Sequence, residues 1–328
     1  MLRLSPPDVQ RFTQAQTFEV VYGGAEANVA LSLATFGAAV RYISRLPQND
    51  LGDACLNALR QFGVDTEYIV RGGERLGIYF YEKGAAQRGG KVIYDRAGSA
   101  FATITPGMIN WQAVFAEADW FHWSGISPAV SQSAAETTAE ALEVAQSMGL
   151  TISCDLNYRH TLWKWGKTPG EVLPELLSRS QVFVGNQESV ETVFGLRPES
   201  PLDDLTAREQ WMCEQVAAHF PNLHTIATTV RTTLSASHNR LGGVLWHRGQ
   251  HYTTPPYDIT PIIDRVGGGD SFMAGLIYGL RRYESKQDAL HFAVAASVLK
   301  HAIIGDANLA TVPEVEGFMG GSRRMMSR

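Results

Sequence analysis

From about residue 119 onward, short apolar runs alternate with helical patterns, and this alternation constrains the fold more than any other feature of the chain. We expect strands at 120–123, 151–154, 182–184 and 225–228, with a helix rich in Ala and Glu at 133–146 between the first two. Strands that alternate with helices predict an α/β class, in which helices cover both faces of a parallel sheet.

Each expected strand ends in a polar residue. These residues are Ser124, Asp155, the pair Gly185-Asn186, and Thr229. In open α/β sheets the ligand crevice lies beyond the carboxyl ends of the strands, so we expect the chemistry there.

The segment from residue 76 to 97 differs from the rest and reads as an antiparallel hairpin. Aromatic runs at 77–81 and 91–96 flank a turn that contains Gly89-Gly90. Residues 1–22, with alternating Phe18, Val20 and Tyr22, are expected to pair with it. A hairpin of this kind is commonly a lid, and its open edge favours a homo-oligomer that forms through the lid.

The predicted division of the chain follows from this hairpin. Residues 1–22 and 72–100 form the β lid, and residues 23–71 and 101–328 form the α/β domain that binds nucleotide and substrate.

Composition excludes several function classes. The 328 residues carry a net charge of -5, which argues against nonspecific binding to nucleic acid, so local arginines must hold any anionic ligand. The three scattered cysteines fit neither a disulfide framework nor a metal site. No apolar run is long enough for a membrane span or a secretory signal, and we therefore expect a cytoplasmic protein. We expect the terminal residues 320–328 to fray.

The most informative stretch runs from Asp264 to Leu276. Phe272, Met273 and Leu276 recur at helical spacing, so a helix is expected to begin near Gly269-Asp270. The consecutive glycines 267–269 let the backbone approach a ligand closely, and their N–H groups with the helix dipole form an anion site. An aspartate in the first helical turn also compensates the helix dipole, so spacing alone leaves the role of Asp270 open. The Walker pattern is absent.

Residues 264–275 resemble the C-terminal signature of the ribokinase-type (phosphofructokinase B) sugar kinases, from which they depart at Arg265 and Gly268. Residues 23–30 resemble the N-terminal signature of the same family. The resemblance implies a ribokinase-like three-layer α/β/α domain with a small β-sheet lid, and ATP and Mg²⁺ as cofactors. It also implies that Asp270 takes the proton of the sugar hydroxyl while the amides of Gly267, Gly268 and Gly269 stabilise the transferring phosphate, roles that suit phosphoryl transfer.

Several segments are closest to 2-keto-3-deoxygluconate kinases, namely 94–100, 122–129, 155–159 with 162–163, and 235–239. This resemblance implies ATP-dependent phosphorylation of the 6-hydroxyl of that sugar acid. The residues it places against the substrate are Gly24, Asn28, Tyr79, Tyr94, Arg96, Ile126 and Arg159. The alternatives are another sugar kinase of the fold, such as a fructokinase or a ribokinase-like enzyme, and a catalytically weakened sugar-binding homologue.

Arg96 and Arg159 have an independent rationale, because an acidic sugar requires planar and permanently charged donors. The alternative for both is a surface salt bridge, and the alternative for Tyr79 and Tyr94 is packing within the hairpin.

The nucleotide side is implied by three segments. Residues 184–189 resemble the family's Asn-x-x-Glu stretch, with Ser189 where the family has a carboxylate. The resemblance places Asn186 and Glu188 near the phosphates, with Glu188 holding Mg²⁺ through water or else compensating a helix dipole. Thr229, Arg231, Gly267 and Gly269 would face the nucleotide, and Asn308 would lie near adenine. His122 and His301 are expected to be packed rather than to bind a metal.

Kinases of this family usually begin with a buried strand ahead of the segment that here starts at Met1. The resemblance therefore implies either a start upstream of Met1 or a sheet without one central strand, which would leave unpaired backbone groups.

Overall fold

The computed structural model describes residues 1–199, 202 and 204–321, so the expected fraying of 322–328 lies outside the described residues. The largest sheet has six strands in the order β12-β11-β10-β9-β8-β7. Its strands are β7 (Trp120–Ser124), β8 (Thr151–Asp155), β9 (Val182–Val184), β10 (Thr225–Ser235), β11 (His238–His247) and β12 (Gln250–Ile259). The four strands predicted from apolar runs are all present, and β7 to β10 are parallel, as expected.

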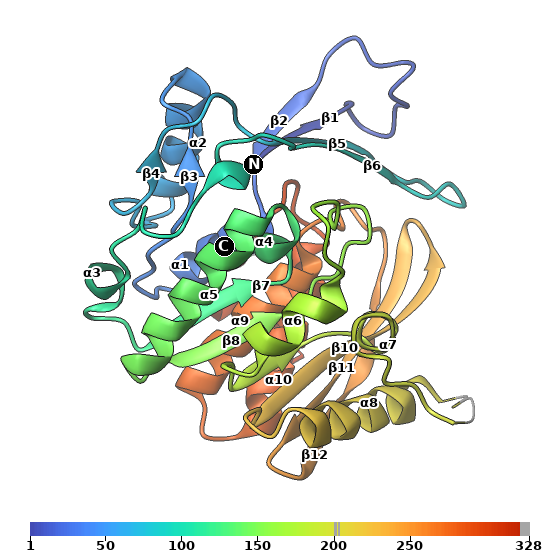
Figure 1. Ribbon diagram of the computed structural model, residues 1–328. Coiled ribbons are helices and arrows are strands. Elements are labelled where there is room, and N and C mark those ends of the chain that lie inside the picture. Colours follow the sequence, from blue (N-terminus) through green and yellow to red (C-terminus); the bar gives the residue numbers. More distant parts are fainter. Residues whose placement is uncertain (200–201, 203, 322–328) are drawn as a thin grey trace.

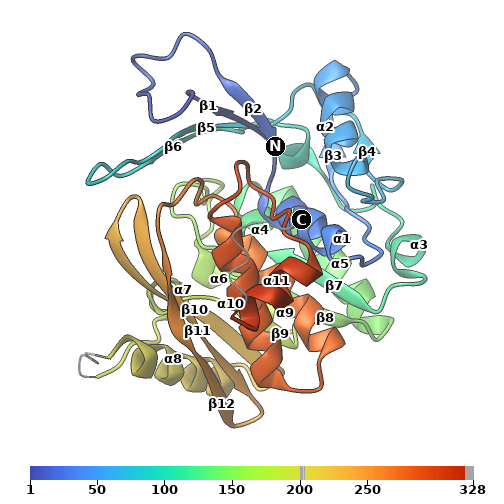
Figure 2. The same ribbon diagram turned by 180° about the vertical axis from the view of Figure 1, so that it is seen from behind.

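Helices cover both faces of this sheet, which gives the predicted three layers (Figure 1). One face carries α3 (Trp111–Phe115), α5 (Gln132–Ser147), α6 (Pro169–Leu177), α7 (Gln187–Phe194) and α8 (Leu205–His219). The other face, in front in Figure 2, carries α1 (Ala25–Thr35), α9 (Gly268–Arg282), α10 (Lys286–Lys300) and α11 (Val312–Met319). Two further helices, α2 (Asp50–Arg60) and the short α4 (Ile126–Ala129), complete the set of named α-helices.

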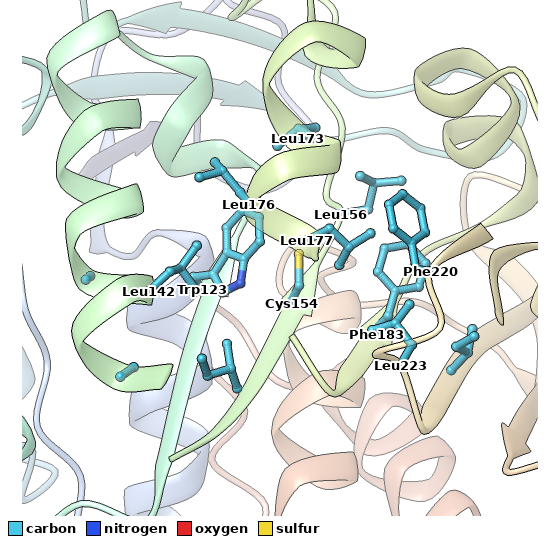
Figure 3. Close-up of a cluster of buried hydrophobic side chains, with 14 of the residues drawn as sticks. Trp123, Leu142, Cys154, Leu156, Leu173, Leu176, Leu177, Phe183, Phe220 and Leu223 are labelled. Atoms are coloured by element: carbon cyan, nitrogen blue, oxygen red, sulfur yellow. The ribbon is translucent and has the colours of Figure 1, made fainter. Parts of the chain in front are cut away.

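The alternation of side chains along the strands builds a core on each face of the sheet. Phe183 of β9 points into the cluster drawn in Figure 3, with Trp123, Leu142 and Cys154. Its neighbours Val182 and Val184 belong to the cluster on the opposite face, against α9 and α10. The sheet is therefore apolar on both faces, as a strand sequence of consecutive apolar residues predicts.

Two strands of the large sheet were not predicted. β10 continues to Ser235 and turns back into β11, and β12 follows as an antiparallel edge strand. Gly242 and Gly243 interrupt the apolar pattern of β11, and Pro255 and Pro256 lie within β12. Proline is tolerated on an edge strand, so these residues are compatible with strands although they break the sequence pattern that would predict them.

A second sheet of four strands forms the lid, in the order β2-β1-β5-β6. Its strands are β1 (Leu2–Ser5), β2 (Glu19–Tyr22), β5 (Ile78–Glu82) and β6 (Lys91–Asp95). The expected hairpin is the antiparallel pair β5 and β6, and the N-terminal segment joins it through β1, which pairs in parallel with β5. The short strands β3 (Arg45–Leu46) and β4 (Val70–Arg71) pair separately.

The strand register gives the lid two different faces. Tyr79 lies opposite both Arg3 and Tyr94, so these three side chains share one face. The next row across the four strands is Val20, Leu4, Phe80 and Ile93, and it lies on the other face because successive side chains alternate.

β7 is the edge strand on the far side of the six-stranded sheet. In the described part of the chain its one ladder partner is β8. Residues 120–123 of β7 line a cavity together with residues 38–46.

Two further findings concern the expected class of protein. Cys55, Cys154 and Cys213 are buried free thiols. Among the helices formed by the described residues, none has the length and apolar character needed to cross a bilayer.

Candidate active site

The predicted site residues come together around one cavity of about 1260 Å³. It extends from the lid strands to the carboxyl ends of β7 to β10 and the start of α9. The residues predicted for the site that line it are Gly24, Asn28, Tyr79, Tyr94, Arg96, Ile126, Arg159, Asn186, Glu188, Thr229, Arg231, Gly267, Gly268, Gly269 and Asp270. Asn308 is the exception, since it is fully buried and is not among the lining residues.

The glycine turn owes its shape to close packing. α9 is preceded by Gly267, which has a left-handed φ of 81°. A Cβ at Gly267 would overlap the carbonyl oxygen of Asp306, and a Cβ at Gly268 would lie 2.9 Å from the ring of His301. Glycine is therefore required at Gly267, whereas a side chain at Gly268 would displace the ring of His301. The amide of Gly268 donates to the carbonyl oxygen of Arg265 at 3.4 Å, so the candidates for an anion site at the start of α9 are the amides of Gly267 and Gly269, residues that line the cavity.

Asp270 is 9% exposed and lies in the first turn of α9. Its Oδ2 accepts a hydrogen bond of 2.6 Å from Nδ2 of Asn28, a residue 242 positions away. Burial raises the pKa of Asp270 to about 8, and the nearby carboxylates of Asp155 and Asp306 add to this, whereas the bond from Asn28 opposes it. A carboxyl group with a raised pKa, facing a cavity and bonded to the other signature segment, is suited to accept a proton.

Arg96 and Arg159 reach the cavity from the lid and from the loop after β8. The alternative role for both residues, a surface salt bridge, requires an ion pair with a carboxylate. In the part of the chain that the structure describes, neither arginine forms one. Nε of Arg96 is buried and has no hydrogen-bond partner there. Burial lowers the pKa of Arg96. These guanidinium groups are available to an anionic ligand.

The two tyrosines of the lid differ in their surroundings. Their rings lie 6.2 Å apart, so part of their role is packing within the hairpin. The hydroxyl of Tyr79 donates to Oδ2 of Asp306, whereas Tyr94 is half-buried at the cavity.

On the predicted nucleotide side, Asn186 caps α7, and its Oδ1 accepts a bond of 2.8 Å from the amide of Ser189. Glu188 is exposed in the first turn of the same helix. Within 1–199, 202 and 204–321, no group of three or more His, Cys, Asp or Glu residues could hold a metal ion directly. The single carboxylate of Glu188 at the cavity fits Mg²⁺ that keeps most of its water ligands.

The two histidines are packed, as expected. Nδ1 of His122 lies 3.0 Å from Oγ of Ser153, and Nδ1 of His301 lies 2.7 Å from the carbonyl oxygen of Ser297. Burial lowers the pKa of each imidazole to about 4.

Sequence reasoning missed the buried ion pairs beneath the site. Arg3 of β1 contacts Asp264 at 2.8 Å and Asp306 at 2.7 Å, and all three side chains are almost completely buried. The signal in the sequence is a charged residue between two apolar residues, Leu2 and Leu4, of an expected lid strand. Asp155, expected at a strand end and within the segment 155–159 but without a predicted role, has a pKa that burial raises to about 6.

The profile of the pfkB family carbohydrate kinases matches residues 3–309. The chain belongs to this family. It is 31% identical to a 2-dehydro-3-deoxygalactonokinase of Haloferax volcanii over 98% of this chain and 94% of that protein. It is 25% identical to a 2-dehydro-3-deoxygluconokinase of Bacillus subtilis, over 94% and 90% of the two chains. The crystal structure of 2-dehydro-3-deoxygluconokinase from Thermotoga maritima matches with a TM-score of 0.93 and 42% identity, over 98% of this chain and 97% of that one.

These findings confirm the ribokinase-like fold and the predicted class of enzyme. The protein is a carbohydrate kinase, a phosphotransferase whose acceptor is a sugar hydroxyl. The roles of individual residues remain predictions from the geometry.

A first prediction concerns Asp270. Asp270→Asn keeps the size and the hydrogen-bonding capacity of the side chain but cannot take up a proton, so we expect kcat to fall by about 100- to 10,000-fold with little change in sugar affinity. The matched control is Asp288→Asn, in the first turn of α10, where an aspartate only compensates the helix dipole. Equal loss of turnover in both variants would contradict a role of Asp270 as base.

A second prediction concerns the pH profile. Asp270 must be deprotonated to act as base, so kcat/KM should rise with pH through a limb near its raised pKa of about 8. Asn28→Ala removes the bond that favours the carboxylate and should move the limb to higher pH. Asp155→Asn removes a nearby negative charge and should move it to lower pH. Profiles of kcat/KM against pH test this, and a limb that stays in place in both variants would be inconsistent with Asp270 as the titrating group.

Proposed function

We propose that this kinase transfers the γ-phosphate of ATP to the 6-hydroxyl of 2-keto-3-deoxygluconate, with Mg²⁺ as cofactor. The observation that carries the proposal is that Arg96 and Arg159 line the same cavity as the buried carboxyl group of Asp270 and, among the described residues, form no ion pair with a carboxylate. Nη1 of Arg159 donates to the carbonyl oxygen of Tyr158 at 2.9 Å, and Nε of Arg96 has no partner within the described part of the chain. A sugar acid presents a carboxylate at one end and a hydroxyl at the other, and the cavity offers a partner for each.

In this mechanism Arg96 and Arg159 bind the carboxylate and so fix which hydroxyl reaches Asp270. Two charged donors from separate segments define an orientation, which a single contact cannot do. Asp270 accepts the proton of the terminal hydroxyl as its oxygen attacks phosphorus. The amides of the turn at 267–269 and the positive end of α9 stabilise the charge on the transferring phosphoryl group.

For the nucleotide, the proposal assigns the phosphates to Thr229 and Arg231 of β10 and to the glycine turn, which line the same cavity as Asn186 and Glu188. Mg²⁺ neutralises phosphate charge during transfer, and Glu188 would hold it through water. Asn308 accepts a hydrogen bond of 3.0 Å at Oδ1 from the amide of Ala310, which shapes the loop that the proposal places beside the nucleotide.

The names of similar proteins support a sugar acid over a neutral sugar, since two of them are named for 2-dehydro-3-deoxygluconate. The relative from Haloferax volcanii is named for the galactonate isomer, which shares the carboxylate and the terminal hydroxyl. The second candidate substrate is therefore 2-keto-3-deoxygalactonate. The buried free thiols fit a reducing compartment, and we place the reaction in the cytoplasm.

A third prediction tests the substrate. With purified protein, ATP and Mg²⁺, we expect kcat/KM to be highest for 2-keto-3-deoxygluconate in a panel with its galactonate isomer, fructose and ribose. A preference for fructose or ribose would refute the proposal. Measurable binding of the acids with no turnover would instead favour a weakened, sugar-binding homologue.

The same panel tests the arginines. Arg96→Gln and Arg159→Gln each remove a charged hydrogen bond, so KM for the sugar acid should rise about 10- to 100-fold, while weak activity on neutral sugars should not fall. The matched control is Arg75→Gln, which breaks a surface ion pair with Asp95 on the same lid and should leave KM unchanged.

A fourth prediction concerns the proposed homo-oligomer. Val20 and Ile93 are 56% and 54% exposed on the lid face that points away from the cavity, and Phe18 is 40% exposed nearby. An apolar sheet face of this kind favours association with a second copy. Light scattering should show a dimer or larger species, and the double change Val20→Glu with Ile93→Glu should give a monomer. Leu51→Glu, at an exposed site on α2, is the control. A monomeric wild-type protein would rule out this interface.

A further inference from the structure

Lys300 is a buried lysine that has no role in the proposed reaction. It is the last residue of α10 and its side chain is 0% exposed. Nζ donates to the carbonyl oxygens of Asp264, at 3.2 Å, and Ile303, at 3.0 Å. Among the described residues, no carboxylate oxygen lies within 4.0 Å of this ammonium group.

An ordinary structural explanation accounts for one of these two bonds. A lysine at the end of a helix interacts favourably with the last carbonyl groups, and Ile303 follows α10 directly. Asp264 belongs to a different segment, the one that leads into the glycine turn at 267–269. Burying an ammonium group costs several kcal/mol, so its position between two segments requires a further reason.

The charge balance under the site supplies that reason. Arg3 is paired with both Asp264 and Asp306, so these three groups together carry a net charge of about -1. Lys300 brings the sum to zero. Without it, an uncompensated negative charge would lie behind the turn whose amides receive the transferring phosphate.

We propose that Lys300 is a positioning residue whose ammonium group serves as the resident cation of this oxygen-lined position, so that phosphoryl transfer needs no dissociable monovalent cation. It fixes the carbonyl group of Asp264 relative to the loop at 303–306. That loop in turn packs against the glycine turn, because Gly305 donates to Oδ2 of Asp264 at 3.2 Å and Gly267 lies against Asp306. The inference rests on phosphoryl transfer to a sugar and not on which sugar acid is the substrate.

The first test uses the unmodified protein. Its kcat is measured with tetramethylammonium as the sole monovalent cation and then with added K⁺, Na⁺ or NH₄⁺. We expect these cations to change kcat by less than about twofold, because the position is already filled by a tethered charge. Stimulation by K⁺ or NH₄⁺ beyond that range would overturn the proposal.

The second test creates space for a free cation. In Lys300→Ala, kcat should fall by about 100-fold in tetramethylammonium and should recover in part with K⁺, NH₄⁺ or methylammonium. Lys300→Met fills the space with an apolar chain and should show no recovery. Lys286→Ala, at the first residue of the same helix, is the control and should behave like the unmodified protein.

A readout other than activity separates this role from simple stabilisation. K⁺ should raise the Tm of Lys300→Ala, because a ligand that binds only the folded state stabilises it, and should leave the Tm of the unmodified protein unchanged. If Lys300→Ala keeps full kcat in tetramethylammonium and loses only stability, Lys300 is a structural residue and the proposal is wrong. If neither Lys300 variant folds, the cation dependence of the unmodified protein decides.

Discussion

The buried ion pairs of Arg3 hold together the parts of the chain that make the site. One guanidinium group joins the first strand of the lid to Asp264, before the glycine turn, and to Asp306, in the loop after α10. Its Nε also donates to Ser5 at 2.7 Å, and the ring of Tyr81 lies under the guanidinium carbon at 4.7 Å. A buried pair of this kind adds little net stability by itself, but loss of one partner costs about 3–5 kcal/mol because a charge is left unpaired. The position of the lid is therefore tied to the integrity of the glycine turn.

Local patterns predicted the elements well where the relevant information is close in the sequence, and most of the predicted site residues line one cavity. Apolar runs gave β7 to β10, and the three glycines followed by Asp270 gave the start of α9. β11 and β12 were not predicted because glycine and proline interrupt the apolar pattern of a strand. They form through pairing of β11 with β10 and of β12 with β11. Arg3 and Lys300 could not be assigned from the sequence, because their partners are carbonyl and carboxylate oxygens of segments that only the tertiary fold brings near. Asn308 stays a prediction, since the resemblance places it at the nucleotide, while in the structure it is buried with its Oδ1 bonded to the amide of Ala310.

The cavity continues past the site to the open side of β7. Residues 114, 115, 117, 118, 134 and 141 line it there together with residues 38–46, so this part is bounded by the α5 side of the core and carries the charged pair of Arg41 and Glu117. Apolar side chains that line a cavity lack packing contacts on the side that faces it. Backbone groups along a strand edge without a neighbouring strand lack hydrogen-bond partners from the sheet. The packing is therefore closer around Asp270, where the ion pairs of Arg3 are buried, than along β7, where the cavity continues.

The reactivity of Asp270 is set by residues from both ends of the chain. Burial alone would keep its carboxyl group protonated near neutral pH, and the neighbouring carboxylates of Asp155 and Asp306 act in the same direction. The hydrogen bond from Asn28 and the charge of Arg159 act in the opposite direction. Arg3 pairs with Asp306 and Asp264 together, so it offsets only part of the effect of Asp306 on Asp270. A base that is neutral in the empty site and ionises as cationic groups gather around the substrate would avoid placing a bare carboxylate beside an incoming sugar acid.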